Sequence, residues 1–169
     1  DWNEWIDKYI TGYKHLKEDA KGKLNILLGM ELRFDENDND YLVYGFDEDF
    51  VLNNDLTKFN NPEEFRPFAE ENGLVIFQAH PFRIGMTVTD PELLDGVEVY
   101  NGHGDHNSRN SVANKWADLH SLRKLSGSDF HGNLSLEPGG VYFDEYLTDS
   151  KQVAKALIEG RYSLKIFEE

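Results

Sequence analysis

The spacing of apolar residues changes from helical to strand-like near residue 23. The apolar positions before that point are Trp2, Trp5, Ile6, Tyr9, Ile10, Tyr13 and Leu16. They recur every three or four residues, which predicts an amphipathic helix over residues 2–20. Residues 24–34 form a mostly apolar run, which predicts a strand buried on both faces, as in a parallel sheet. After an acidic turn at 35–40, residues 41–46 predict a second strand.

The remainder of the chain alternates between helical and strand patterns. Asn61 is predicted to cap a helix that begins at Pro62 and carries acidic residues in its first turn. Further helices are predicted at 111–119 and 149–159, and further strands at 74–78, 96–100, 122–126 and 162–167. Strands that alternate with helices predict right-handed crossovers and a largely parallel sheet. We therefore expect one α/β domain over residues 1–169.

Composition and charge narrow the choice of partner. The 169 residues suffice for a buried core and carry a formal net charge of −15. This charge disfavours binding to a nucleic-acid backbone or to an anionic membrane, but a small phosphorylated molecule stays compatible if metal ions or arginines line the site. Cysteine is absent, which excludes disulfides and thiolate ligands. No apolar run reaches membrane-spanning length and no signal peptide is visible, so we predict a cytoplasmic protein.

Residues of the metal-ligand type follow three of the predicted strands. They are Glu31 in Gly-Met-Glu, His80 in Ala-His-Pro-Phe, and Asp129 and His131 in Gly-Ser-Asp-Phe-His-Gly. Carboxylate oxygen and imidazole nitrogen together suit zinc, manganese or iron, and α/β folds build their sites where strands end. A buried Glu31 needs a cation or an exit to solvent, and Pro81 should hold His80 in extended backbone. We expect these four residues to bind metal together; the alternative for Asp129 and His131 is a capping carboxylate and a surface histidine.

Three other side chains are weaker candidates for the same site. Arg83 lies close behind His80 and would suit a phosphate oxygen, although an ordinary surface arginine fits the pattern as well. His103 and His106 follow the strand predicted at 96–100. They either contact metal or substrate, or lie in a mobile, glycine-rich surface loop.

Taken together, the motifs resemble a known family of enzymes. Gly-x-Glu, Ala-His-Pro-Phe, Val-Glu-Val-Tyr-Asn-Gly (97–102) and Gly-Ser-Asp-x-His-Gly occur in the order found in the PHP (polymerase and histidinol phosphatase) superfamily of metal-dependent phosphoesterases. The resemblance covers residues 24–132. It implies a distorted (β/α)7-type barrel that holds two or three divalent metal ions, often zinc, manganese or iron. It also implies that Glu31, His80, Asp129 and His131 are the metal ligands and catalytic residues.

One motif of that family has no counterpart in this chain. The family's first motif, His-x-His, is missing before Glu31, where the only histidine is His15 in the predicted helix. The chain therefore resembles the carboxyl-terminal two-thirds of a PHP domain without its first strands. Four ligands alone would not bind the full metal cluster of the family. Activity would therefore require that other residues provide the missing histidine ligands. Open sheet edges would favour a homo-oligomer.

From these motifs we predict a metal-dependent phosphoesterase that hydrolyses a small phosphorylated molecule with metal-activated water. Glu31 would bridge two metal ions because a carboxylate has two oxygens, and Arg83 would orient the phosphate. Two alternatives remain open. One is a non-catalytic α/β binding or assembly module with a partial metal site. The other is an amidohydrolase-like enzyme, since the same nucleophile attacks carbonyl carbons.

Overall fold

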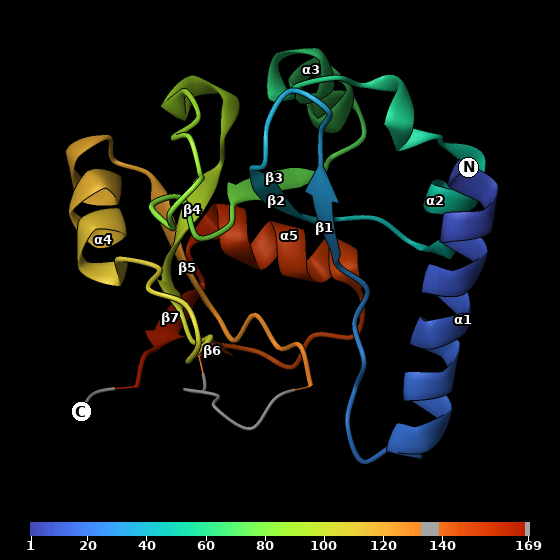
Figure 1. Ribbon diagram of the computed structural model, residues 1–169. Helices are drawn as coiled ribbons and strands as arrows, with labels where there is room; N and C mark the ends of the chain where they lie inside the picture. Colours follow the sequence, from blue (N-terminus) through green and yellow to red (C-terminus); the bar gives the residue numbers. More distant parts are fainter. Residues whose placement is uncertain (133–138, 168–169) are drawn as a thin grey trace.

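The computed structural model describes residues 1–132 and 139–167, which form a mixed α/β structure around a five-stranded sheet (Figure 1). The strands lie in the order β1 (Met30–Arg33), β2 (Asp40–Tyr44), β3 (Val75–Gln78), β4 (Gly96–Asn101) and β5 (Arg123–Gly127). The pairs β1–β2 and β2–β3 are antiparallel, whereas β3–β4 and β4–β5 are parallel. A separate antiparallel pair consists of β6 (Gly140–Phe143) and β7 (Tyr162–Lys165).

The five-stranded sheet is open rather than closed. Its edges are β1 and β5, each paired with one neighbour, so no barrel exists among the described residues. The predicted α/β class is confirmed and the distorted barrel is not seen. The prediction of a largely parallel sheet is wrong for the pairs β1–β2 and β2–β3, which are antiparallel. Residues 34–39 are too few for the crossover that a parallel β1–β2 pair would need, so the chain folds back as a hairpin.

The helices predicted from the sequence are present within one or two residues of their expected bounds. The helical elements are α1 (Trp2–Ala20), α2 (Glu48–Asn53), α3 (Pro62–Glu71), α4 (Asn110–Leu119), α5 (Ser150–Glu159) and the 3-10 turns η1 (Leu56–Lys58) and η2 (Pro91–Leu93). The side chains of Asp1, Asn61 and Asp149 accept backbone N–H groups of the first turns of α1, α3 and α5. No helix in the described ranges has the length and hydropathy needed to cross a membrane.

Two apolar layers cover the faces of the sheet. On one face α1 and α3 pack against strand residues such as Leu32 and Val43. On the other face α5 packs against Phe77 and Leu125. Figure 1 shows α1 near the β1 edge and α4 beside β4 and β5. The carboxyl ends of β3, β4 and β5 stay free of these layers and carry the polar residues described below.

The strand β1 is shorter than predicted and buried on one face only. Met30 and Leu32 point into the core, whereas Glu31 and Arg33 are exposed. Alternating burial of this kind is typical of an antiparallel strand with one solvated face. The expectation of a strand buried on both faces over 24–34 is therefore wrong, and Glu31 is a half-exposed carboxylate rather than a buried one.

Candidate metal site

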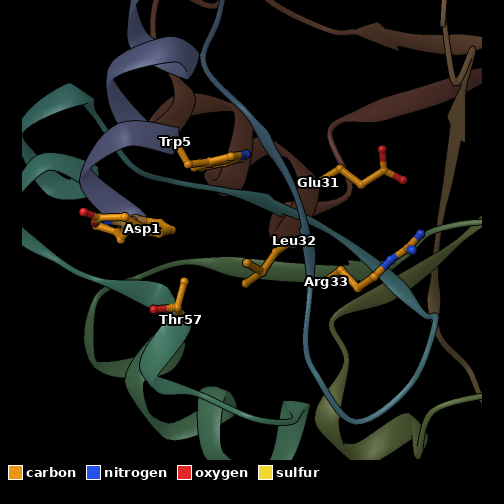
Figure 2. Close-up of a pocket in the computed structure, with 7 residues that line it drawn as sticks. Asp1, Trp5, Glu31, Leu32, Arg33 and Thr57 are labelled. Carbon is orange, nitrogen blue, oxygen red and sulfur yellow. The ribbon is translucent and has the colours of Figure 1, made fainter.

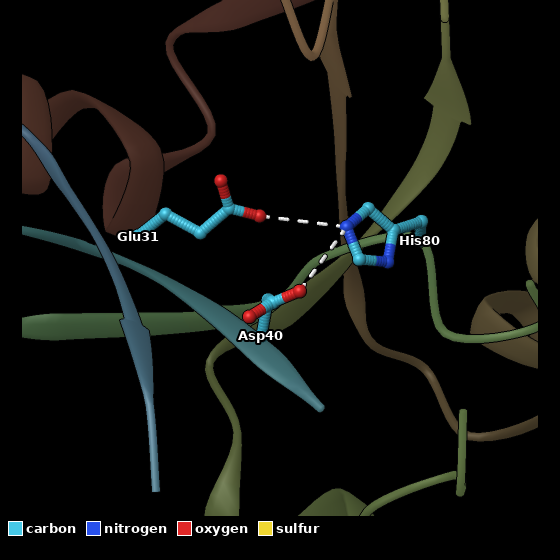
Figure 3. A group of neighbouring side chains, drawn as sticks. All are labelled: Glu31, Asp40 and His80. Atoms are coloured by element: carbon cyan, nitrogen blue, oxygen red, sulfur yellow. Dashed lines mark ion pairs between the residues drawn. The ribbon is translucent and has the colours of Figure 1, made fainter. Parts of the chain in front are cut away.

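Glu31, Asp40 and His80 form a compact group, called here the acid–histidine trio (Figure 3). Glu31 comes from β1, Asp40 begins β2 and His80 lies just beyond the end of β3. The Nε2 atom of His80 lies 3.4 Å from Oε1 of Glu31 and 3.7 Å from Oδ2 of Asp40. One ligand atom from each residue lies within 4.8 Å of the others. His80 lies 40 positions after Asp40 and 49 positions after Glu31 in the chain. The pairing of β1, β2 and β3 brings the three residues together.

The backbone of His80 is held in an unusual conformation. Its φ angle is +28°, outside the extended region that Pro81 was expected to impose. The His80 N–H donates to Oε2 of Glu98 at 2.9 Å, and the neighbouring Ala79 N–H donates to the carbonyl of Asp40 at 2.9 Å. These bonds hold a strained conformation that aims the imidazole at both acids, as is common at functional sites.

The charge and donor set of the trio suit a divalent cation. Two carboxylates that approach one imidazole nitrogen repel each other unless a cation lies between them. Carboxylate oxygen and imidazole nitrogen are the ligands that zinc, manganese and iron accept. Arg33 offsets part of the charge, because it lies opposite Asp40 in the hairpin and donates to both of its oxygens at 2.8 Å. The side chain of Glu31 is 40% exposed, so a ligand can reach its carboxylate from solvent.

A second group lies at the ends of β4 and β5 and is called here the Asn101 network; its members are Arg83, Glu98, Asn101 and Asp129. Oδ2 of Asp129 accepts from Nη2 of Arg83 at 2.5 Å and from Nδ2 of Asn101 at 3.1 Å. Burial opposes ionisation of Asp129, but the hydrogen bonds from Arg83 and Asn101 outweigh it and hold its pKa below the usual value. This ion pair fixes Asp129 with φ at +48°.

Glu98 connects the network to the trio. Its side chain is buried, and Oε2 accepts both the His80 N–H at 2.9 Å and Nδ2 of Asn101 at 3.0 Å. Burial raises the pKa of Glu98, because the charged form loses hydration that the two hydrogen bonds only partly replace. The sequence analysis did not single out Glu98 as an individual candidate.

Three histidines surround the network. The ring of His103 lies 4.5 Å from that of His106 and 5.5 Å from that of His131, measured between centroids. His103 is buried, whereas His106 and His131 are exposed. Nδ1 of His131 lies 2.9 Å from the carbonyl oxygen of Asp129, so Nε2 is the ring nitrogen through which His131 could bind a ligand.

All four predicted site residues line one cavity of about 300 Å³. The lining residues are Glu31, Arg33, Asp40, His80, Arg83, His103, His106, Asp129 and His131. Only Glu31 and His80 of the predicted four belong to the trio, so the shared ligation of all four stays a prediction. Sequence reasoning missed Asp40, because it was assigned to the turn at 35–40. Its pairing opposite Arg33 in the hairpin brings it to the site, and the sequence alone does not reveal that register.

A larger cavity of about 400 Å³ lies on the other side of β1 (Figure 2). Trp5 and Leu32 lie on one side of β1, whereas Glu31 and Arg33 extend from the opposite side (Figure 2). The aromatic side chains of α1 dominate this cavity, and no histidine contributes to it. Glu31 and Arg33 line both cavities, whereas Asp40, His80 and Asp129 line the smaller one and not the larger.

Comparisons with known proteins found likeness in structure but not in sequence. No family model matches the chain, and no curated protein matches it in sequence. The crystal structure of PsfC from Pseudomonas syringae PB-5123 is similar with a TM-score of 0.63 and 19% identity, over 83% of this chain and 59% of that one. A two-domain protein from Bacteroides vulgatus ATCC 8482, described as containing a predicted PHP-like metal-dependent phosphoesterase, is similar with a TM-score of 0.57 and 18% identity.

These similarities concern the fold. The second comparison covers 91% of this chain and 48% of the Bacteroides vulgatus protein, so the chain spans less than two thirds of either solved structure. The described residues combine a mixed five-stranded sheet, layers of helices and a polar cavity at the strand ends. The chain therefore has a mixed α/β structure that fits a PHP-like fold.

Proposed function

We propose that this protein is a metal-dependent phosphoesterase that hydrolyses a small phosphorylated molecule. The observation that carries the proposal is that the acid–histidine trio and the side chains of Arg33 and Arg83 line the same cavity of about 300 Å³. Acids and an imidazole suit a divalent ion, and guanidinium groups suit phosphoryl oxygens. Likeness in fold to a protein described as containing a predicted PHP-like phosphoesterase supports this function.

The residues of the trio fit a divalent ion such as zinc, manganese or iron. Glu31, Asp40 and Nε2 of His80 would hold it, within the 4.8 Å that separates their ligand atoms. When bound, such an ion supplies water that is activated near neutral pH and neutralises charge on the phosphoryl group. Oδ1 of Asp129 and Nε2 of His131 are further ligand atoms in the same cavity, which His103 and His106 also line, and they would hold a second ion.

The protein's own side chains would bind and orient the substrate. Arg33 and Arg83 approach the cavity from two sides and would hold phosphoryl oxygens, which a chain with a net charge of −15 would otherwise repel. Arg83 is already oriented by Asp129 and Asn101, so little ordering is needed when the phosphate binds.

One observation favours the alternative of a non-catalytic binding module. Both oxygens of Asp40 accept from Arg33, and Asp129 accepts from Arg83, so each acid already has an internal partner. A module of this kind would bind a metal ion weakly or would use the charged cavity to bind an anion without turnover.

The test combines metal content with turnover of p-nitrophenyl phosphate. We expect the purified protein to retain divalent metal and to hydrolyse the ester, and Asp40→Asn to lose both. Asp35→Asn is the matched control, because Asp35 is an exposed acid in the same hairpin turn. Metal binding without turnover would favour the binding module. Unchanged metal content and turnover in Asp40→Asn would refute the assignment of the trio.

A further inference from the structure

Asn101 lies at the end of β4 with both ends of its amide fully used. Its side chain is buried. Nδ2 donates to Oε2 of Glu98 at 3.0 Å and to Oδ2 of Asp129 at 3.1 Å. Oδ1 accepts from Nη2 of Arg83 at 3.0 Å, from the His103 N–H at 3.1 Å and from Oγ of Ser108 at 3.3 Å. The amide therefore places its donors between two acids and its acceptor towards a guanidinium.

The residue type follows from these charged neighbours. An amide offers two N–H donors and one carbonyl acceptor on the same short side chain. A carboxylate of the same shape would turn an acceptor towards both Glu98 and Asp129. A small apolar side chain would leave buried charged groups without partners, which is costly. At this position the amide alone satisfies two acids and an arginine together.

A bulge in β4 makes this arrangement possible. Residues three positions apart in a regular strand point to opposite faces, so Glu98 and Asn101 could not meet. The register of β4 against β5 shifts between Glu98 and Tyr100, which adds one residue and brings both side chains to the same face. Asn110, the first residue of α4, clamps the backbone of Asn101, accepting its N–H at 3.0 Å and donating to its carbonyl at 3.2 Å.

The bonds of Asn101 reach both strained residues of the site. Asp129 has φ at +48° and bonds directly to Asn101, while His80 has φ at +28° and is connected through Glu98. Strained backbone persists only where surrounding bonds hold it. We propose that Asn101 is the positioning residue of this cavity, which fixes Arg83 and Asp129 relative to His80. Its effect on turnover rests on the proposed function, whereas its effect on the geometry does not.

The test compares Asn101→Leu with wild type in three measurements, because leucine has a similar size and removes both the acceptor for Arg83 and the donors to the two acids. The first is the side-chain NMR signal of Arg83 in ¹⁵N-labelled protein, which needs neither metal nor substrate. The second and third are the affinities for Zn²⁺ and for inorganic phosphate by calorimetry. We expect Asn101→Leu to lose the restrained Arg83 signal and to weaken phosphate binding about tenfold, a loss of the size seen when a supporting hydrogen bond is removed.

The control and a second variant separate positioning from folding. Asn39→Leu is the control, because Asn39 is also buried and its amide bonds to Thr87 at both ends, away from the network. The double variant Glu98→Gln with Asn101→Leu removes the buried charge that loses its amide donor, so it is the variant to measure if the single variant does not fold. It also lacks the acceptor for Arg83, so Arg83 should be less restrained in it as well.

Each outcome decides the role of Asn101. A lost Arg83 signal in the single or double variant, with the signal intact in Asn39→Leu, supports positioning. An unchanged Arg83 signal in a folded variant overturns it, as does equal loss in the control. If the wild type binds neither zinc nor phosphate, the proposed function fails while the Arg83 signal still tests Asn101.

Discussion

The acid–histidine trio lines one cavity with Arg83 and Asp129 of the Asn101 network, but the two groups differ in how their charges are satisfied. In the trio, the contacts of His80 with its two acids are 3.4 and 3.7 Å long, and Arg33 is 55% exposed. In the network, Arg83 is 16% exposed and Asp129 5%, and their atoms lie 2.5 Å apart. The network is thus tightly paired, whereas the trio still has room and charge for a cation. We infer that the trio receives the metal ion and that the network holds Arg83 in place for the phosphate.

The largest expected difference concerns the two arginine–aspartate pairs. Asp129→Asn leaves Arg83 buried without its counter-ion, which should lower the free energy of unfolding by about 3 kcal/mol. Asp40→Asn breaks a pair whose arginine is exposed and can be solvated, so it should cost less than about 1 kcal/mol. Urea denaturation at pH 7 measures both. The pKa of Asp129 is depressed in the folded state, so its stabilisation is present above its unfolded pKa of about 3.9 and is lost as the pH falls through the lower folded value. Equal losses in the two variants would contradict the comparison.

Added zinc should stabilise the protein through the trio. A ligand present at 100 times its dissociation constant raises the free energy of unfolding by about 2.7 kcal/mol, because it binds only the folded state. We expect this gain in wild type and its loss in Glu31→Gln. Glu71→Gln, an exposed acid at the end of α3, should keep the full gain. Thermal melts with and without zinc show the difference, and an identical shift in all three proteins would exclude the trio as the site.

Glu98→Gln should change how the stability of the protein depends on pH. Because burial raises the folded pKa of Glu98, its ionised form destabilises the protein as the pH rises above the unfolded value of about 4.3. Glutamine can still accept the His80 N–H and the Asn101 amide without that charge. The variant should therefore match wild type near pH 4 and exceed it at pH 8 by on the order of 1 kcal/mol. Urea titrations at the two pH values test this, and a variant less stable at pH 8 would show that the charge itself is needed.

The smallest expected effect comes from Arg33→Gln. Removing a cation beside Asp40 should strengthen zinc binding by about threefold at low salt, because the competing guanidinium is half exposed and partly screened. Phosphate binding should weaken at the same time. Lys23→Gln removes an equal charge from the loop before β1 and is expected to change neither affinity. Calorimetry at two salt concentrations measures the effect, and weaker zinc binding in Arg33→Gln would be the opposite of this expectation.

The helices were predictable because local signals define them. Asn61 with Pro62, and Asp149 before α5, cap their helices as the sequence indicates. The bounds of β1 and its direction were not predictable, since an apolar run does not reveal which side of a strand lacks a neighbour. The short α2 and β6 carry too little periodicity to be recognised, and the sequence did not predict them.

The sequence motifs predicted several residues of the site, but not which side chains contact one another there. Glu31, His80, Asp129 and His131 were found because ligand-type residues follow apolar runs, and all four line the cavity. Asp40 and Asn101 were missed for two physical reasons. Hairpin pairing decides the neighbours of Asp40, and a bulge in β4 decides those of Asn101. Neither register nor bulges can be deduced from the identity of the residues alone.

The placement of Arg33 opposite Asp40 has a consequence for how a metal ion would come and go. A site made only of acids and histidine is left with unbalanced charge when its ion leaves, and its folding is then tied to metal supply. Here an arginine on the adjacent strand stands in as an internal cation. Binding of a metal ion would then replace the guanidinium of Arg33 as the cation beside Asp40. The protein would keep the same fold with and without the ion.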